Sequence, residues 1–331
     1  MKKILSLLMA ATMMVTVLAA CGGGSGSGSG AAKVDTNTVA VGAVVIARDD
    51  VPEDDIYAFV STIFDNKDAI TEQHAKGGEL DLDFASSVTS VPYHPGAARY
   101  FSEKGKDVAA VKDGAGTGSS KALSFGTGGD TGTYYGFGGV LSSYVSNNTD
   151  VSVTALTSGG SKANIEDLAA GDVQLAFVQS DVMSYAYNGE RLFDTAVTGF
   201  SVVAALYMEQ VQIVTTNPDI KSVADLSGKS VSIGDRGSGV WFNAVDVLGA
   251  YGIDPDSGIS PVFQGFGDSA ESLKDGKIDA AFVVAGAPTT AIVDLATSKP
   301  VYLVGLDQEH TNDLLAASPY YSAYTIPAGT Y

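Results

Sequence analysis

The chain has 331 residues, of which 38 are Asp or Glu and 19 are Lys or Arg, so its net charge is −19. Such an acidic chain has no basic stripe to neutralise phosphates, which excludes nucleic acid and anionic lipid surfaces as partners. A single cysteine excludes an internal disulfide, and the length is enough for two lobes that each have a core.

Residues 1–21 have the pattern of a secretory signal peptide. Lys2 and Lys3 precede an apolar run, and small residues lie directly before Cys21. This pattern resembles the lipobox of bacterial lipoproteins, in which the cysteine is lipid-modified after cleavage; an ordinary secreted protein with an unmodified cysteine is the alternative. The resemblance implies an extracytoplasmic protein that is anchored through Cys21 to the outer face of the cell membrane. Loss of the two lysines changes the net charge to −21.

Residues 22–32 form a Gly/Ser tether that is typical of flexible coil. The segment 33–105 follows, with an acidic run at 49–55. This run is typical of the first turn of a helix, which we expect to begin near Pro52, because negative charge there opposes the helix dipole. A cation site is the alternative. Residues 106–122 are predicted to be a flexible join.

Residues 123–287 contain two copies of one pattern, in which strands and helices alternate after a Gly-rich turn. The third strands of the two copies align at an offset of 105 residues. Such alternation predicts β-α-β units on parallel sheets, and two units predict two lobes. We assign 123–207 to the first lobe and 208–300 to the second, and we expect 301–331 to return to the first, with a crossing strand at 300–306. Ligands bind beyond the carboxyl ends of such strands, which predicts a cleft between the lobes.

The Gly-rich turn of the first copy, FGTGGDTGTYYGFGG at 125–139, lacks the motifs of nucleotide binding. A dinucleotide fingerprint needs glycine where Thr131 stands, and a P-loop needs lysine where Thr133 stands. A helix that begins near Thr133 still offers unpaired N–H groups and the positive end of its dipole. The second copy has a Gly-rich turn at 237–239, next to Arg236. A guanidinium beside two helix N-termini predicts a clamp for a small carboxylate, whereas turns without a ligand are the alternative.

Sixteen residues are candidates for contact with the carboxylate, because they lie in or directly after these turns or at the ends of the strands between them. They are Thr131, Gly132, Thr133, Tyr134, Tyr135, Ser158, Gly160, Ser161, Asn164, Gln179, Ser180, Arg236, Gly237, Ser238, Gly239 and Trp241. The adjacent tyrosines point about 100° apart on a helix, so we expect one to pack in the core and the other to reach the cleft. Core packing is equally open for Trp241.

The residues that an enzyme needs are poorly represented. None of the three histidines accompanies a nucleophile motif, and GGSKA around Ser161 departs from G-x-S-x-G at Ala163. No paired His or Cys spacing predicts a metal. We therefore expect no catalysis, no metal and no cofactor. A hydrolase or other enzyme that acts on a small anion in the same cleft is the alternative, and a structural lipoprotein is a third possibility.

Four segments resemble, in this order, the TAXI family of solute-binding receptors for TRAP transporters. They are FGTGGDTGTYY at 125–135, TSGGSKANIEDLAAGDVQLAFVQSD at 157–181, GDRGSG at 234–239 and YTIPAGTY at 324–331. The resemblance implies a type II periplasmic-binding-protein fold with two lobes, no catalysis, and delivery of the solute to a TRAP permease in the membrane. It suggests amino acids such as glutamate, or dicarboxylates such as 2-oxoglutarate, as ligands.

The order of the segments departs from the family. The stretch 38–105, with HPGAARY at 94–100, resembles the family's C-terminal part but precedes the first lobe. The chain therefore looks like a circular permutant, and we expect this stretch to pack as a strand and helices against both lobes, with the strand near Tyr331. The family's crossing strand reads LYPE followed by V-H, whereas this chain has LYME at 206–209 and Gln212 in place of His.

These features together predict an extracytoplasmic solute-binding receptor that acts as a monomer. The solute binds one lobe of an open cleft, and closure of the other lobe completes its contacts. The closed form is then the one that the permease recognises.

Overall fold

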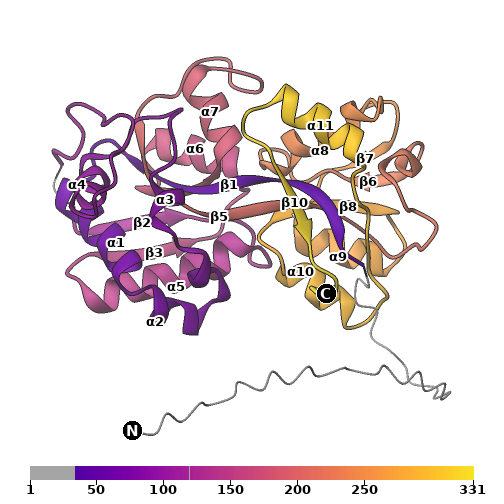
Figure 1. The fold of residues 1–331 in the computed structure, drawn as a ribbon, viewed down its shortest axis with the longest axis horizontal. Helices are drawn as coiled ribbons and strands as arrows, with labels where there is room; N and C mark the ends of the chain where they lie inside the picture. The colour runs from indigo at the N-terminus through magenta and orange to yellow at the C-terminus, as the bar shows by residue number, and fades with distance from the viewer. Residues whose placement is uncertain (1–33, 119) are drawn as a thin grey trace, which may run out of the picture.

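The structure, a computed structural model, describes residues 34–118 and 120–331. The predicted signal peptide, Cys21 and the tether lie outside the described residues. Two α/β lobes lie side by side, and two long strands run through both of them (Figure 1). In the part of the chain that the structure describes, no helix is both long and apolar enough to cross a membrane.

The first lobe contains a parallel sheet with the strand order β3-β2-β4. Its elements are β2 (Ala122–Gly126), α5 (Thr133–Asn148), β3 (Ser152–Leu156), α6 (Ser161–Ala170), β4 (Leu175–Gln179) and α7 (Ser180–Asn188). The helices bury apolar side chains against the sheet, where the rings of Phe125 and Phe177 stack at 4.9 Å. Gly171 ends α6 with a φ of 90°, the left-handed conformation that glycine adopts most easily at helix ends.

The second lobe repeats this arrangement with the strand order β7-β6-β8. Its elements are η2 (Val223–Leu226), β6 (Ser230–Ser232), α8 (Val240–Ala250), β7 (Ser260–Val262), α9 (Phe266–Lys274), β8 (Ala280–Ala285) and α10 (Thr290–Ala296). Each parallel strand has a counterpart in the first lobe at the same place in the sheet, as the internal repeat predicts. The predicted two-lobed α/β fold is therefore confirmed.

The strands β1 (Thr36–Arg48) and β5 (Phe200–Thr215) are antiparallel partners that connect the lobes. In the first lobe β1 also pairs with β4, and in the second lobe β5 pairs with β8, so that one sheet continues through the molecule. Side chains of β1 belong to the core of the second lobe up to Val41 and to the core of the first lobe from Ala43. On β5 the same change falls after Tyr207.

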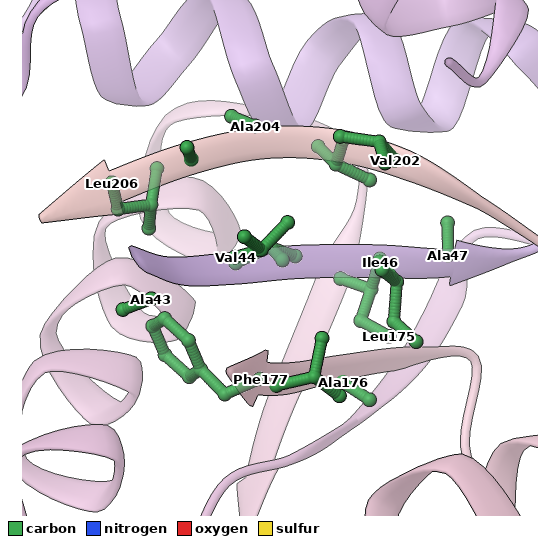
Figure 2. Close-up of a cluster of buried hydrophobic side chains, with 14 of the residues drawn as sticks. Ala43, Val44, Ile46, Ala47, Leu175, Ala176, Phe177, Val202, Ala204 and Leu206 are labelled. Carbon is green, nitrogen blue, oxygen red and sulfur yellow. The ribbon is translucent and has the colours of Figure 1, made fainter. Parts of the chain in front are cut away.

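The strand β1 lies at the centre of the first lobe's core. Every residue of the stretch 39–47 is buried, because β4 and β5 flank the strand and α6 and α7 pack against it. Figure 2 shows Val44 and Ile46 of β1 between Phe177 of β4 and Val202 of β5. A strand that is buried on both faces needs a continuous apolar run, and VAVGAVVIA provides one.

The segment between β1 and β2 covers the first lobe. It forms α1 (Glu53–Asp65), α2 (Lys67–Gln73), η1 (Ala75–Glu79), α3 (Leu82–Ala85) and α4 (Pro95–Glu103). As predicted, α1 begins directly after Pro52, and its acidic first turn pairs with Arg99 of α4. We expected the stretch 38–105 to pack as a strand and helices against both lobes. Its helices lie mainly on the first lobe, whereas its strand, β1, runs through both lobes and pairs at its start with β10 in the second.

Residues 106–122, which we expected to be a flexible join, are tied to the first lobe by their main chain. Tyr93 exchanges main-chain hydrogen bonds of 2.8 Å with residues 110 and 112, and Gly116 N donates to Asp49 O at 2.9 Å. These bonds attach the segment next to the start of α1, so it is a part of the first lobe's surface rather than a bare linker.

Residues 301–331 stay with the second lobe, which corrects our expectation that they return to the first. β9 (Tyr302–Leu303) pairs with the end of β5, α11 (Gln308–Ala317) packs on α8, and β10 (Ser322–Ile326) pairs with the start of β1. The return crossing is made by β1 instead. The physical reason is length, because β1 has 13 residues and reaches through both lobes whereas β9 has two.

A substitution at Gly96 tests how closely α4 packs on α1. A Cβ atom there would lie 2.2 Å from Glu53 O and 2.7 Å from Tyr57 N, which are main-chain atoms of α1. We predict that Gly96→Ala lowers the free energy of unfolding by about 1–3 kcal/mol, because the helices must separate, and urea unfolding measures this. Gly139→Ala in α5, where a Cβ meets nothing within 4 Å, should be neutral or stabilise by up to about 1 kcal/mol. Equal midpoints for Gly96→Ala and the parent would contradict the close packing.

Candidate functional site

A cavity lies between the lobes, where the carboxyl ends of the parallel strands meet. Its volume is about 70 Å³, several times what one water molecule needs. Each of the six parallel strands contributes residues at or after its carboxyl end, and β5 contributes one residue from its middle. The lining residues are Gly128, Gly129, Gly132, Thr133, Tyr134, Ser158, Gly159, Gly160, Ser161, Gln179, Glu209, Asp235, Ser238, Gly239, Val240, Gln264, Gly265, Phe266, Val284 and Ala285.

Four helices direct their N-termini toward this cavity. The helices α5, α6, α8 and α9 begin directly after Gly132, Gly160, Gly239 and Gly265, and none of these glycines provides a side-chain cap. All four glycines line the cavity. The first N–H groups and the positive dipole ends of four helices, two from each lobe, therefore favour an anionic group there.

A buried carboxyl group, that of Glu209, lies in the same cavity. The Tyr134 hydroxyl donates a hydrogen bond to it at 2.6 Å. Burial raises the pKa of Glu209 to about 8; the Tyr134 hydrogen bond and Lys76 oppose this rise, and Asp181 adds to it. Asp235 also lines the cavity, and burial raises its pKa. Because an ionised carboxyl is costly to bury alone, this wall favours a positively charged group beside it.

Gln179, at the end of β4, adds an unpaired acceptor to the cavity wall. Its Nε2 donates to Asn243 Oδ1 of the second lobe at 3.0 Å, whereas its buried Oε1 has no hydrogen-bond partner in the part of the chain that the structure describes. An unpaired buried acceptor costs about 1–3 kcal/mol, which a donor on a bound solute would offset. Among the described residues that line the cavity there is no Lys, Arg or His, so the side chains bring negative charge and the helix ends bring positive potential.

The lobes are closed over the cavity. The Thr133 hydroxyl donates to Gly286 O at 3.0 Å, and Ala163 N donates to Gly237 O at 3.1 Å. Each bond joins the first turn of a first-lobe helix to a loop of the second lobe. The loops at the carboxyl ends of both sheets are thus in direct contact, an arrangement that can hold a solute away from water.

The structure brings nine of the sixteen predicted residues together in the cavity wall. They are Gly132, Thr133, Tyr134, Ser158, Gly160, Ser161, Gln179, Ser238 and Gly239. Tyr134 faces the cavity, whereas Tyr135 lies at the surface with 38% of its area exposed. We expected one of these tyrosines in the core and the other at the cleft; Tyr134 takes both places, since it also packs in the first lobe's core, and Tyr135 points to solvent.

Arg236, our candidate for the anion clamp, does not line the cavity. It is exposed, and its guanidinium lies over the Phe263 ring, 3.8 Å from the ring centroid. The neighbouring Asp235 faces the cavity instead, because successive residues of a turn point in different directions. The positive potential of this site therefore comes from helix N-termini rather than from an arginine.

Two further candidates, Asn164 and Ser180, support the cavity walls. Asn164 Nδ2 donates to the main-chain oxygens of Thr127 and Phe177, both at 2.7 Å, which ties the Gly-rich turn to β4. The Ser180 hydroxyl oxygen accepts from Gly42 N at 3.0 Å and so ties α7 to β1. Asn164 Nδ2 and the Ser180 hydroxyl are thus engaged in holding the cavity walls together, and neither residue lines the cavity.

The last three candidates, Trp241, Thr131 and Gly237, also lie outside the cavity lining. Trp241 packs edge-on against Phe242, with ring centroids 5.3 Å apart. Thr131 and Gly237 meet the opposite lobe through their carbonyl oxygens, the former accepting from Ala291 N at 3.3 Å. These residues contribute to the contact between the lobes.

Sequence reasoning missed Glu209, Asp235, Gln264 and Phe266 as cavity residues. Glu209 had a detectable signal, because an acidic residue inside an apolar crossing strand needs a partner or a function. Asp235 and Gln264 lie in loops after β6 and β7, and Phe266 is the first residue of α9. The direction of a loop side chain depends on contacts with the other lobe, and local sequence does not contain that information.

The histidine of the HPGAARY stretch, His94, has a structural role. His94 is buried, with Nε2 3.0 Å from Val51 O and Nδ1 accepting from Gly96 N at the start of α4. Burial lowers its pKa to about 4. No group of three or more His, Cys, Asp or Glu within 34–118 and 120–331 is arranged to hold a metal ion.

Comparison with known proteins identifies both a family and distant structural relatives. A model of the NMT1-like family matches residues 26–105 and 125–331. The periplasmic aliphatic sulphonate-binding protein SsuA from Escherichia coli is 17% identical, with a TM-score of 0.36, over 56% of this chain and 60% of that one. An ancestral arginine-binding protein bound to arginine is 18% identical, with a TM-score of 0.41, over 56% and 79%. A putative L-cystine ABC transporter from Listeria monocytogenes is 18% identical, with a TM-score of 0.39, over 59% and 89%.

The chain thus spans less than two thirds of the sulphonate-binding protein. At TM-scores below 0.5 these structures bear on neither the solute nor the partner of this chain.

A substitution at Gly239 tests whether the closed cavity is the binding site. A Cβ atom there would lie 1.7 Å from Gln179 Oε1 and 2.9 Å from Ser161 Oγ, both in the opposite lobe. We predict that Gly239→Ala weakens solute binding at least about tenfold, because it obstructs closure, while the melting temperature without solute stays nearly constant. Calorimetry and thermal unfolding measure the two effects. Gly249→Ala in the same helix, where a Cβ meets nothing within 4 Å, should change neither. Unchanged affinity in Gly239→Ala would place the site elsewhere.

Proposed function

Because the chain belongs to the NMT1-like family, we propose that it is a solute-binding protein that closes its lobes over a small carboxylate and catalyses no reaction. One observation carries the proposal. Four helix N-termini without side-chain caps and three acceptor side chains, Glu209, Asp235 and Gln179, converge on one cavity between the lobes. Such a cavity has complementary places for a negative and a positive group.

The carboxylate of the solute lies at the helix N-termini in this proposal. Two of the helices, α5 and α6, belong to the first lobe, and α8 and α9 belong to the second. An anion between them is attracted by both lobes at once, so its binding favours the closed form over the open one. This differential affinity is the physical basis for capture by closure.

The positive group of the solute lies beside Glu209 and Gln179. An ammonium group supplies charge for the Glu209 carboxylate and a hydrogen bond for Gln179 Oε1, which has no partner among the described residues. A 2-oxo acid supplies neither the positive charge nor the donor. We therefore propose an amino acid as the solute, in preference to 2-oxoglutarate and similar dicarboxylates, which the family resemblance also suggests.

The cellular setting follows from the resemblance to the TAXI family. We propose that lipid on Cys21 holds the protein at the outer face of the cell membrane and that a TRAP permease receives the solute from the closed form. A permuted segment order is supported by the hydrogen bond of 2.9 Å from Ala328 N to Asp35, which places the end of the chain beside the start of β1. Residues 106–124, outside the family match, would then be the join.

A panel of matched acids tests the class of solute. Calorimetry compares glutamate with 2-oxoglutarate, alanine with pyruvate, and leucine with 4-methyl-2-oxopentanoate. We predict that the best amino acid binds at least about a hundredfold more tightly than its 2-oxo counterpart, because sites built to bond a donor strongly reject analogues that lack it. Binding of the 2-oxo acids alone would reverse the assignment of the solute, and steady turnover of any acid would support an enzyme instead.

The charge of Glu209 gives a second test. Burial raises its pKa to about 8, so the closed form without a cation needs this carboxyl protonated. Binding of a 2-oxo acid should therefore weaken as the pH rises from about 5 to 8, by at most about tenfold per unit, whereas an ammonium group keeps Glu209 ionised and removes this loss. Asp181, whose pKa burial raises to about 6, affects both solutes alike.

The pH dependence of binding is also measured for Glu209→Gln, which removes the charge of the side chain and nearly keeps its shape. The variant should lose at least about tenfold in amino acid affinity and should abolish the difference in pH dependence, whereas Glu72→Gln on the surface of α2 should do neither. Parallel pH profiles for the two solutes in the parent would show that Glu209 does not face the ammonium group.

A further inference from the structure

A second set of polar contacts joins the lobes next to the cavity. The first lobe contributes Gln179, Asp181 and Arg191, and the second lobe contributes Asn243, Asp246 and Tyr321. We refer to these six residues as the interlobe network. Asn243 and Asp246 lie three residues apart on one face of α8, so a single helix carries both contacts.

The hydrogen bonds of this network form a continuous chain. Gln179 Nε2 donates to Asn243 Oδ1 at 3.0 Å, and Asn243 Nδ2 donates to Asp181 and to the Tyr321 hydroxyl, both at 2.9 Å. Tyr321 donates in turn to Asp246 at 2.9 Å. The chain thus runs from the cavity wall to a pair of charged residues on the other side of the contact.

That charged pair is Arg191 with Asp246. The guanidinium donates to both carboxylate oxygens, at 2.8 and 3.0 Å, and lies over the rings of Tyr185 and Phe242, with distances of 5.1 and 5.3 Å to their centroids. Arg191 has a φ of 56°, an uncommon conformation for a residue other than glycine. Such strain persists where surrounding contacts enforce it and indicates that the position of the guanidinium matters.

Asp181 fixes the directions of the hydrogen bonds. Its Oδ2 accepts from Asn243 Nδ2 at 2.9 Å, and the Tyr321 hydroxyl, which donates its own proton to Asp246, accepts from the same Nδ2. Asn243 must therefore turn its Nδ2 toward Asp181, so its Oδ1 faces Gln179 and accepts from Nε2. Gln179 Oε1 is then left without a partner in the cavity wall. The orientation of this amide is decided by residues that do not line the cavity.

The interlobe network depends on closure because its polar groups are buried between the closed lobes. Asn243 and Asp181 are fully buried and Gln179 is 2% exposed, although each meets the opposite lobe with a polar group. Closing removes these groups from water, which is unfavourable unless all of them are paired. Among the described residues, two buried acceptors of the network have no hydrogen-bond partner, Asp181 Oδ1 and Gln179 Oε1. Of these two residues, Gln179 is the one that lines the cavity, where a solute can complete the network.

We propose that the interlobe network is a closure latch, which forms when the lobes close and is completed by a solute that donates a hydrogen bond to Gln179 Oε1. Asn243, Asp246 and Arg191 are positioning residues: they set the affinity and the preference for an amino group without touching the solute. This inference rests on the proposed function and assigns the regulation of the same site.

The six acids of the panel test the latch on the full-length protein. Arg191→Met should weaken amino acid binding at least about tenfold, mainly through faster dissociation. Asn243→Ala should also reduce the ratio of amino acid to 2-oxo acid affinity at least about tenfold, because the Gln179 amide becomes free to turn. A contact that merely supports the fold would weaken both acids equally and leave the ratio unchanged, and that result would overturn the latch.

Arg48→Met is the matched control. Arg48 also makes a two-point ion pair with an aspartate, Asp50, and its side chain is 27% exposed, as is that of Arg191, but both partners lie in the first lobe. It should leave affinity and selectivity unchanged. An equal loss in Arg48→Met and Arg191→Met would show that the effect is a general one of surface charge and would overturn the latch.

Small-angle scattering without solute separates this inference from the proposed function. Arg191→Met should have a larger radius of gyration than the parent, because the closed form is less populated, whereas Arg48→Met should match the parent. If the parent binds none of the six acids, the proposed function is wrong and scattering alone decides on the latch. Identical radii in all three proteins, or unchanged dissociation in Arg191→Met where the parent binds, would overturn it.

Discussion

The pairing of β1 with β5 is the interaction on which the remaining structure depends. The chain passes between the lobes twice, along these two strands, and the hydrogen bonds between them run through both cores. The stretch 39–47 of β1 is buried on both faces, so the strand cannot leave without uncovering the centre of the first lobe. The pairing also restricts movement, because the lobes can open only if both strands bend or twist. Two shifts of register in the pairing, at Ala43/Val44 and Val45/Ile46, lie close to the point where β1 changes lobe.

The crossing strands also explain the unusual chemistry of the cavity. Glu209 lies on β5 just beyond Tyr207, where the strand passes from one core to the other, so its carboxyl group is buried yet adjacent to the space between the lobes. The six parallel strands end around the same space, and the helices that follow four of them begin with uncapped glycines. Negative side chains and positive helix ends therefore meet in one small volume. The carboxyl groups favour a positive partner and the helix ends a negative one, so the site is suited to a solute that carries both charges.

Closure couples this cavity to the contact beside it. Gln179 belongs to both, since its amide bonds to Asn243 and its side chain also lines the cavity. Because Gln179 is shared, binding of a solute in the cavity affects the interlobe network directly, and no separate allosteric path is needed. The solute and the interlobe network then both stabilise the closed form. Asn243, Asp246 and Arg191 do so without touching the solute.

The sequence by itself determined the two-lobed fold, because alternating apolar strands and helices with a repeat of about 105 residues leave few other ways to bury their apolar faces. It also located the Gly-rich turns and nine of the cavity residues, since a helix N-terminus after a parallel strand has a fixed place at the sheet edge. Only the tertiary structure decided which side chains of those turns point inward. Arg236 and Asp235 are neighbours, yet the first lies exposed over the Phe263 ring and the second lines the cavity. It likewise decided that β1, rather than residues 300–306, makes the return crossing, because the partner of a strand depends on segments far away in the chain.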